Sequence, residues 1–150
     1  MKYLLIFSLT ILVACNASDK KTAEAENTNR DSLSQVAMQD SSNYTSIQWI
    51  DSVNQNLGNV QEGQVVDITW KFKNAGNKPL VIADVAAGCG CTVAEKPKEP
   101  IAPGGEEIIK ARFDSKGQSA GINRKQVTVR ANTSEQVYYL NFTVNIAPKS

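Results

Sequence analysis

The residues with the most reactive side chains in this chain are its three cysteines, and two of them are almost adjacent. Cys89 and Cys91 flank the single residue Gly90, and a second glycine precedes the pair. In a regular strand, the Cα atoms of residues two apart are separated by nearly 7 Å, the upper limit for a disulfide. Glycine tolerates backbone conformations that other residues avoid, so it would let the chain bend and bring the two cysteines closer.

The Cys89-Gly90-Cys91 motif suits several kinds of chemistry. The pair could shape a tight connection between strands, exchange a disulfide with a partner, or bind a soft ion such as Cu(I) through two thiolates. Bridging to another molecule is a further alternative. The sequence offers neither a histidine nor an evident helix start beside the pair that would lower the pKa of a thiol. Cys89 and Cys91 are therefore a candidate disulfide, redox or metal-binding pair, and the sequence leaves these alternatives open.

The common catalytic groups are missing elsewhere in the sequence. None of the 150 residues is a histidine, which excludes Ser-His-Asp and Cys-His nucleophiles and a histidine-ligated zinc. Glu106 and Glu107 are neighbours in an expected strand, so their side chains diverge to opposite faces. Gly58 and Gly63 have the spacing of a phosphate-binding loop, but Gln64 stands where that loop requires lysine. We therefore expect no catalytic activity and no bound cofactor.

The third cysteine, Cys15, ends a segment with the features of a bacterial secretion signal. Lys2 supplies a positive charge, and residues 4–14 form a mostly apolar run that is too short to span a bilayer of ~30 Å. The run ends in Leu-Val-Ala-Cys, which resembles the lipobox of bacterial lipoproteins, whose cysteine is acylated with chains such as palmitate. The resemblance implies a signal peptide over residues 1–14 and a lipid anchor on Cys15. Several acyl chains on one residue hold a protein durably at a membrane.

The residues that follow the lipobox indicate the location and the linker. Asn16 is not the aspartate that resembles an inner-membrane retention signal, so we expect the outer membrane, on its periplasmic side or at the cell surface. Residues 15–45 are mostly small and polar, and such a composition cannot bury enough apolar surface to fold alone. We therefore expect a lipidated cysteine followed by a flexible linker. The net charge of +1 gives no reason to expect a nucleic-acid partner.

From residue 46 to residue 150 the composition changes to that of a β domain. Apolar residues alternate with polar ones in segments bounded by turn-forming residues, which is the pattern of half-buried strands. The expected strands are residues 46–50, 57–60, 65–72, 80–85, 107–113, 126–130 and 137–146. The two clearest apolar faces consist of Val66, Ile68, Trp70 and Phe72, and of Tyr138, Leu140, Phe142, Val144 and Ile146. We therefore predict an all-β, immunoglobulin-like antiparallel sandwich of about seven strands, with Trp70 in its core and Tyr139 exposed.

Four segments of this domain resemble a known family. They are Leu57–Gln64, Phe72–Ile82, Cys89–Thr92 and Ile101–Gly105. In this order and spacing they resemble the domain-of-unknown-function 1573 family, over roughly residues 47–146. The family comprises bacterial secreted proteins and lipoproteins with an immunoglobulin-like sandwich related to ASH domains. Most members have serine before the Cys-Gly-Cys motif, where this chain has Gly88. The resemblance implies a fold and a location, and no reaction.

These observations together favour a binding protein. We expect a membrane-anchored envelope lipoprotein that presents an immunoglobulin-like module for binding or assembly. Its partners would be the membrane, through the lipid on Cys15, and an envelope protein or glycan. The alternative is a thiol-redox or Cu(I)-binding envelope protein that uses Cys89 and Cys91.

Overall fold

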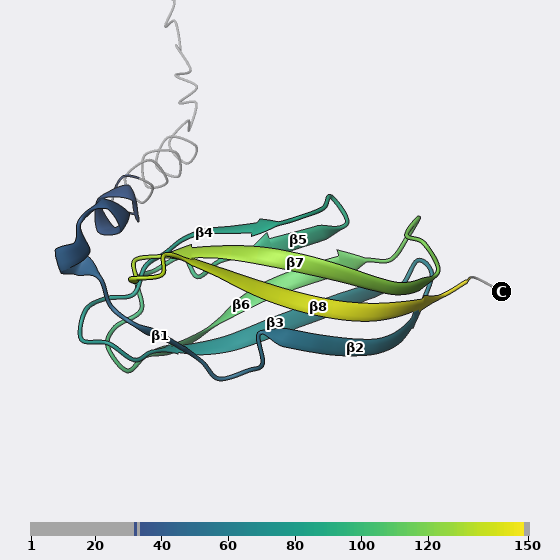
Figure 1. Ribbon diagram of the computed structural model, residues 1–150, viewed down its shortest axis with the longest axis horizontal. Coiled ribbons are helices and arrows are strands. Elements are labelled where there is room, and N and C mark those ends of the chain that lie inside the picture. The colour runs from purple at the N-terminus through teal and green to yellow at the C-terminus, as the bar shows by residue number, and fades with distance from the viewer. Residues whose placement is uncertain (1–31, 33, 149–150) are drawn as a thin grey trace, which may run out of the picture.

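The computed structural model describes residue 32 and residues 34–148. The expected signal peptide, Cys15 and residues 16–31 of the expected linker lie outside the described residues. The described part contains eight strands in two sheets (Figure 1). The strands are β1 (Ile47–Trp49), β2 (Asn54–Gln61), β3 (Val65–Asn74), β4 (Ile82–Ala87), β5 (Thr92–Glu95), β6 (Glu106–Asp114), β7 (Gly121–Ala131) and β8 (Val137–Ala147).

The two four-stranded sheets form an immunoglobulin-like sandwich, as expected. Sheet 1 has the strand order β1-β3-β6-β5, and sheet 2 has the order β2-β8-β7-β4. Several strands that follow one another in the chain belong to different sheets. Among them are β4 and β5, which the Cys-Gly-Cys segment joins. This segment therefore connects the two layers at one edge of the sandwich.

The core lies between the sheets and is built by the alternation in the sequence. Every second residue of β3 from Ile68 to Phe72 is buried, as is every second residue of β8 from Leu140 to Ile146. Phe113 of β6 meets Phe142 of β8 with ring centroids 5.5 Å apart, which joins the two sheets. Trp70 is fully buried and Tyr139 is 56% exposed. Both expectations for these aromatic residues are confirmed.

Two details of the expected sandwich are wrong. There are eight strands rather than seven, because Thr92–Glu95 forms the short edge strand β5, which is too brief to show an alternation pattern. The sandwich is also not purely antiparallel, because β2 pairs with β8 in parallel. The chain crosses from sheet 1 to sheet 2 between β1 and β2 and so arrives beside β8 running in the same direction. A bulge between Asn56 and Asn59 interrupts this pair, and Gly58 accommodates it with a φ of 72°.

A buried asparagine ties one end of the sandwich together. The side chain of Asn74 donates to the carbonyls of Lys78 and Ile101 at 2.8 and 2.9 Å. Its Oδ1 accepts hydrogen bonds from the Thr45 hydroxyl at 2.9 Å and from the Gly76 amide at 3.1 Å. All the hydrogen-bonding capacity of this buried amide is thus used, as the low dielectric of a core requires.

The last residues of the expected linker are folded against this end. Residues 34–39 are helical and Ser41–Asn43 form the 3₁₀ helix η1. Asn132 donates from its side chain to the carbonyl of Asn43 at 2.8 Å and accepts the amide of Thr45 through its own carbonyl at 3.0 Å. Gln136 donates to the carbonyl of Met38 at 3.2 Å. These partners lie about ninety positions away in the chain, so composition alone cannot reveal that this part of the linker is ordered.

Candidate functional site

The Cys89-Gly90-Cys91 segment forms a disulfide-closed turn between β4 and β5. The two sulfurs are bonded to each other, and the Cα atoms of the two cysteines are 5.3 Å apart. The chain therefore bends away from the extended geometry that would hold them nearly 7 Å apart. Both cysteines are partly buried, and Gly90 between them is exposed.

Backbone hydrogen bonds join this turn to β6 and β7, and a third closes the turn itself. The Gly88 amide donates to the carbonyl of Gln126 in β7 at 3.0 Å. The Asp114 amide at the end of β6 donates to the carbonyl of Cys91 at 2.9 Å, and the Thr92 amide donates to that of Cys89 at 3.3 Å. The turn is thus anchored to both sheets, which limits the movement of the sulfur atoms.

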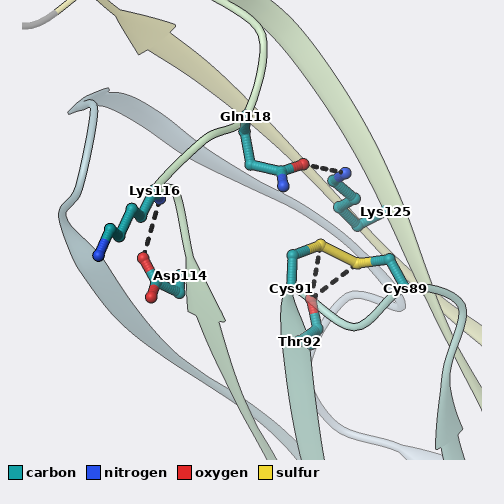
Figure 2. The surroundings of a disulfide bond; sticks show 7 residues. All are labelled: Cys89, Cys91, Thr92, Asp114, Lys116, Gln118 and Lys125. Atoms are coloured by element: carbon teal, nitrogen blue, oxygen red, sulfur yellow. Dashed lines mark hydrogen bonds between the residues drawn. A yellow bond between two sulfur atoms is a disulfide. The ribbon is translucent and has the colours of Figure 1, made fainter.

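Polar side chains surround the disulfide in the close-up view (Figure 2). The Thr92 hydroxyl lies 3.6 Å from the sulfur of Cys89 and 3.8 Å from that of Cys91. The Lys125 ammonium donates to the side-chain carbonyl of Gln118 at 2.7 Å and lies 5.9 Å from the centre of the Phe113 ring. The Lys125 ammonium is thus engaged by Gln118 and by the Phe113 ring.

The expected Cu(I) site is not supported by this geometry. Soft metals bind thiolates, and here the two sulfurs are already joined to each other. Within residues 34–148, no group of three or more histidine, cysteine or acidic side chains is close enough to hold a metal ion. The Cys-Gly-Cys motif is therefore a disulfide turn and not a two-thiolate metal site.

A second polar surface covers the outer face of sheet 2. Its outward side chains alternate with the buried residues of β7 and β8. Amides dominate it, and we call it the amide face. The amide side chains are Asn54, Asn56 and Asn59 of β2, Gln126 of β7, and Asn141 and Asn145 of β8.

Hydrogen bonds between strands align several of these amides. Gln126 donates to the Oδ1 of Asn141 at 3.2 Å, and Asn141 donates to the Oδ1 of Asn54 at 3.0 Å. Further along the same strands, Asn145 donates to the Oδ1 of Asn59 at 2.7 Å. The pairs share a face because β2 and β8 are in register at these positions. The amide face is therefore an ordered array and not a set of independently moving side chains.

A groove of about 450 Å³ adjoins the amide face where β2 begins. Pairing of β2 with β8 starts at Asn141, so the first residues of β8 have an open edge, as Figure 1 shows. Trp49, Val53, Tyr138 and Tyr139 line the groove. The rings of Trp49 and Tyr138 meet edge to face, with centroids 5.8 Å apart. Burial raises the pKa of Tyr138, whose hydroxyl donates to Thr133 at 2.9 Å.

The outer face of sheet 1 differs in character, because it carries charged side chains, four of which form two ion pairs. Arg112 of β6 and Asp67 of β3 form an ion pair at 2.8 Å, and the guanidinium lowers the pKa of the carboxyl. Lys71 and Glu106 form another at 2.7 Å, and the ammonium lowers the pKa of Glu106. Glu106 is thus engaged with Lys71 and not with its neighbour Glu107. Surface pairs of this kind contribute little to stability.

The two glycines with the spacing of a phosphate-binding loop lie in a bulge and in a turn between strands. Gly58 lies in the bulge of β2, and Gly63 follows in the turn that leads to β3. Cys15 lies outside the described residues. The amide face is absent from the sequence-based predictions, although the sequence carries a signal for it. The eight residues of β2 include three asparagines, and β8 has two asparagines four residues apart, although asparagine is disfavoured in strands.

Comparison with models of protein families gives a match for this chain. The model of the family described as "Protein of unknown function (DUF1573)" matches residues 47–146, which include every strand except the last residue of β8. The chain belongs to the DUF1573 family. The match spans both the disulfide turn and the amide face. None of the curated proteins matches the chain.

Several solved structures share the fold of this DUF1573 protein. A protein of unknown function from Porphyromonas gingivalis W83 is 14% identical, with a TM-score of 0.62 over 71% of this chain and 49% of its own. The secreted serine protease VesC from Vibrio cholerae is 11% identical, with a TM-score of 0.50 over 75% of this chain and 25% of its own. The ASH/PapD-like domain 7 of human CEP192 is 8% identical, with a TM-score of 0.47 over 75% of this chain and 91% of its own. This chain therefore spans half or less of the first two proteins, and the likeness concerns the fold.

Proposed function

We propose that this DUF1573 protein is a lipid-anchored binding module of the bacterial cell envelope and that the amide face is its contact surface. The observation that carries the proposal is the asymmetry between the two outer faces. Sheet 1 presents ion pairs, whereas sheet 2 presents an ordered array of neutral amides next to an aromatic groove. Neutral hydrogen-bonding groups on a rigid, exposed sheet suit recognition of a partner.

The anchor rests on the sequence. The lipobox-like ending at Cys15 supports attachment through acyl chains. Within the described residues, no helix is both long and apolar enough to span a bilayer. Residues 34–45 pack against the end of the domain at Asn132 and Gln136. The anchored chain would therefore enter the domain at this end, while the amide face runs along the side of the sandwich.

Attachment and binding can be tested separately. We expect the wild-type protein to incorporate labelled palmitate and to fractionate with membranes, and the Cys15→Ser variant to do neither. For binding, the purified Cys15→Ser protein, which has no acyl chains, is incubated with washed cell envelopes, and Gln126→Ala and Tyr139→Ala in this background should each reduce the bound fraction. Gln48→Ala is the matched control, because Gln48 is an exposed amide on sheet 1. Absence of envelope binding by the Cys15→Ser protein would contradict the proposed binding function.

The disulfide turn supports a second candidate function, the exchange of disulfides with a partner. A thiolate of a partner protein dithiol would attack one sulfur of the Cys89–Cys91 bond and release the other as a thiolate. The second partner thiol, as its thiolate, would then displace the first cysteine. The partner would be oxidised to a disulfide and Cys89 and Cys91 would be reduced by the same two electrons.

Single-cysteine variants test this exchange. Cys89→Ser or Cys91→Ser leaves one thiolate, which would attack the disulfide of an oxidised partner in the reverse of this exchange and release one partner sulfur as a thiolate. The variant has no second cysteine at the turn to displace the partner, so the mixed disulfide should accumulate as bands sensitive to reductant. The double variant Cys89→Ser/Cys91→Ser is the control and should form none. If neither single variant forms a mixed disulfide in envelope preparations, the turn has no exchange function.

A further inference from the structure

We propose that the amide face and its adjoining groove bind a neutral glycan chain. This inference rests on the proposed binding function and specifies the class of partner. The sequence places an unfavourable residue type repeatedly in the strands of sheet 2. Asparagine is among the residues depleted in strands, yet Asn54, Asn56, Asn59, Asn141 and Asn145 are all placed in strands of one sheet and on one face. A local rule broken repeatedly in one place marks a functional surface.

The hydrogen-bonding chemistry of the amide face matches that of a sugar. A primary amide offers two donors and one acceptor oxygen, and a sugar hydroxyl likewise donates and accepts. In the chain from Gln126 through Asn141 to Asn54, each bond uses one donor and one acceptor. Among the described residues, no hydrogen-bond partner is seen for the carbonyl oxygen of Gln126 or for the amino group of Asn54, at the two ends of the chain of bonds. Both are on exposed residues.

The aromatic part of the surface supplies the complementary apolar contact. Tyr139 lies on the same outer face of β8 as Asn141, is 56% exposed, and also lines the groove. Its ring could cover the C–H side of a sugar while the amides bind the hydroxyls, since an aromatic residue presents an apolar body and a polar tip. From Tyr139 to Asn145 the strand runs ~20 Å. The surface is therefore long enough to contact consecutive sugar units.

The low charge of this face favours a neutral glycan over a nucleic acid or an anionic lipid surface. The charged side chains among its outward residues are Asp84, Arg124 and Arg130. A nucleic acid would require several phosphates to be neutralised together, and an anionic lipid surface would require a cluster of lysine and arginine. Two arginines spaced along β7 with one aspartate provide neither. They can donate hydrogen bonds to hydroxyl and ring oxygens instead.

The test uses cell envelopes treated in two ways before incubation with the purified Cys15→Ser protein, which has no acyl chains to bind the membrane. Periodate cleaves vicinal diols and so destroys most sugars, whereas protease digestion removes envelope proteins and leaves glycans. We expect binding to survive protease and to fall at least about tenfold after periodate, the change that 1.4 kcal/mol produces. We also expect Tyr139→Ala and Gln126→Ala to lower the protease-resistant binding, and Gln48→Ala to leave it unchanged.

The outcomes separate this inference from the function on which it rests. Binding that is lost after protease but survives periodate would identify a protein partner and overturn the glycan proposal, while the proposed binding function would stand. Periodate-sensitive binding that the two amide-face variants leave unchanged would also overturn it. A doubling of molecular mass in light scattering that Tyr139→Ala abolishes would assign the face to a second copy of the chain. No binding to untreated envelopes would overturn both proposals.

Discussion

At the scale of single residues, the disulfide is the most unusual covalent feature of the protein. Cys89 and Cys91 enclose only Gly90, so the bond closes a very small ring. A disulfide stabilises mainly by restricting the unfolded chain, and the restriction grows with the length of the closed loop. The turn is also held by backbone hydrogen bonds to β6 and β7 that do not depend on the sulfurs. The bond is therefore more informative about the chemistry of the turn than about the stability of the domain.

Removing the disulfide should cost little stability. For a ring of three residues, the loop-entropy relation gives about 1.6 kcal/mol, so Cys89→Ser/Cys91→Ser should lower the free energy of unfolding by no more than roughly that amount. Urea denaturation of the two proteins measures the difference. Reductant should shift the midpoint of the wild-type protein and leave that of the double variant unchanged. A loss of several kcal/mol would show that the turn depends on the bond for its packing.

Tyr138 should make the domain sensitive to alkali. Burial raises the pKa of Tyr138 above its ordinary value of 10.0. The folded state then keeps this proton at a pH where the unfolded chain has lost it. The resulting stabilisation is fully present below about pH 10 and is lost as the pH rises through the folded-state pKa. Tyr138→Phe should therefore flatten the alkaline fall in the urea midpoint. It should also lower stability at neutral pH, because the hydrogen bond to Thr133 is lost. Parallel alkaline profiles for the two proteins would refute this account.

At the scale of elements, the exposed edges of the sheets are protected in different ways. β4 is the edge of sheet 2 next to the disulfide turn, and the ammonium of Lys96 donates to the carbonyl of Ala83 on this strand. A lysine across an edge hinders pairing with another chain. β2, at the opposite edge, is interrupted by its bulge at Gly58. Bulges discourage further pairing in the same way. The sandwich thus limits edge-to-edge association while its sheet faces remain accessible.

The amide face should carry a stability cost that substitution can relieve. Threonine fits a strand better than asparagine, and the scale of such preferences spans about 1 kcal/mol. Asn59→Thr/Asn145→Thr replaces one cross-strand pair and should raise the free energy of unfolding by up to that amount. Urea denaturation measures this change. In the same assay the reciprocal substitution on sheet 1, Thr69→Asn, should lower the free energy of unfolding. If both substitutions destabilise the protein, the amide pair is retained for stability and the argument from strand preference fails.

At the scale of the whole molecule, the end of the expected linker and the domain are one folded unit. Met38, Asn43 and Thr45 are held by the β7–β8 connection through Asn132 and Gln136. Figure 1 shows this segment at the end of β4 away from the β4–β5 turn. A chain anchored through Cys15 would therefore present the disulfide turn on the side away from its attachment.

Limited proteolysis should reveal this arrangement. A protease of broad specificity should leave a resistant fragment that begins before Tyr44, and not at the strand that starts at Ile47. The reason is that the backbone groups of the intervening residues are hydrogen bonded. Mass spectrometry of the fragment identifies its first residue. Gln136→Asn shortens the side chain that reaches Met38 while tolerating the φ of 56° at this position. This variant should be cleaved closer to the domain, and an unchanged fragment would contradict the role of Gln136.

Much of the architecture is determined by local patterns in the sequence. The alternation through Trp70 in β3 and through Leu140 and Phe142 in β8 specifies which side chains are buried, because side chains point alternately to the two faces of a strand. The same reasoning places Tyr139 outside and separates Glu106 from Glu107. The order of the four family-like segments also identifies the DUF1573 family before any coordinate is known.

The tertiary structure decides what depends on residues far apart in the chain. Local pattern gives no register between β2 and β8, yet that register brings Asn54 beside Asn141 and creates the amide face. It also does not tell whether Cys89 and Cys91 are bonded, or that Asn132 orders residues before Thr45. The sequence by itself determines which face of each strand is apolar, because that property has a period of two residues. Only the packed structure determines which polar groups meet, because strand pairing is a non-local choice of direction and register.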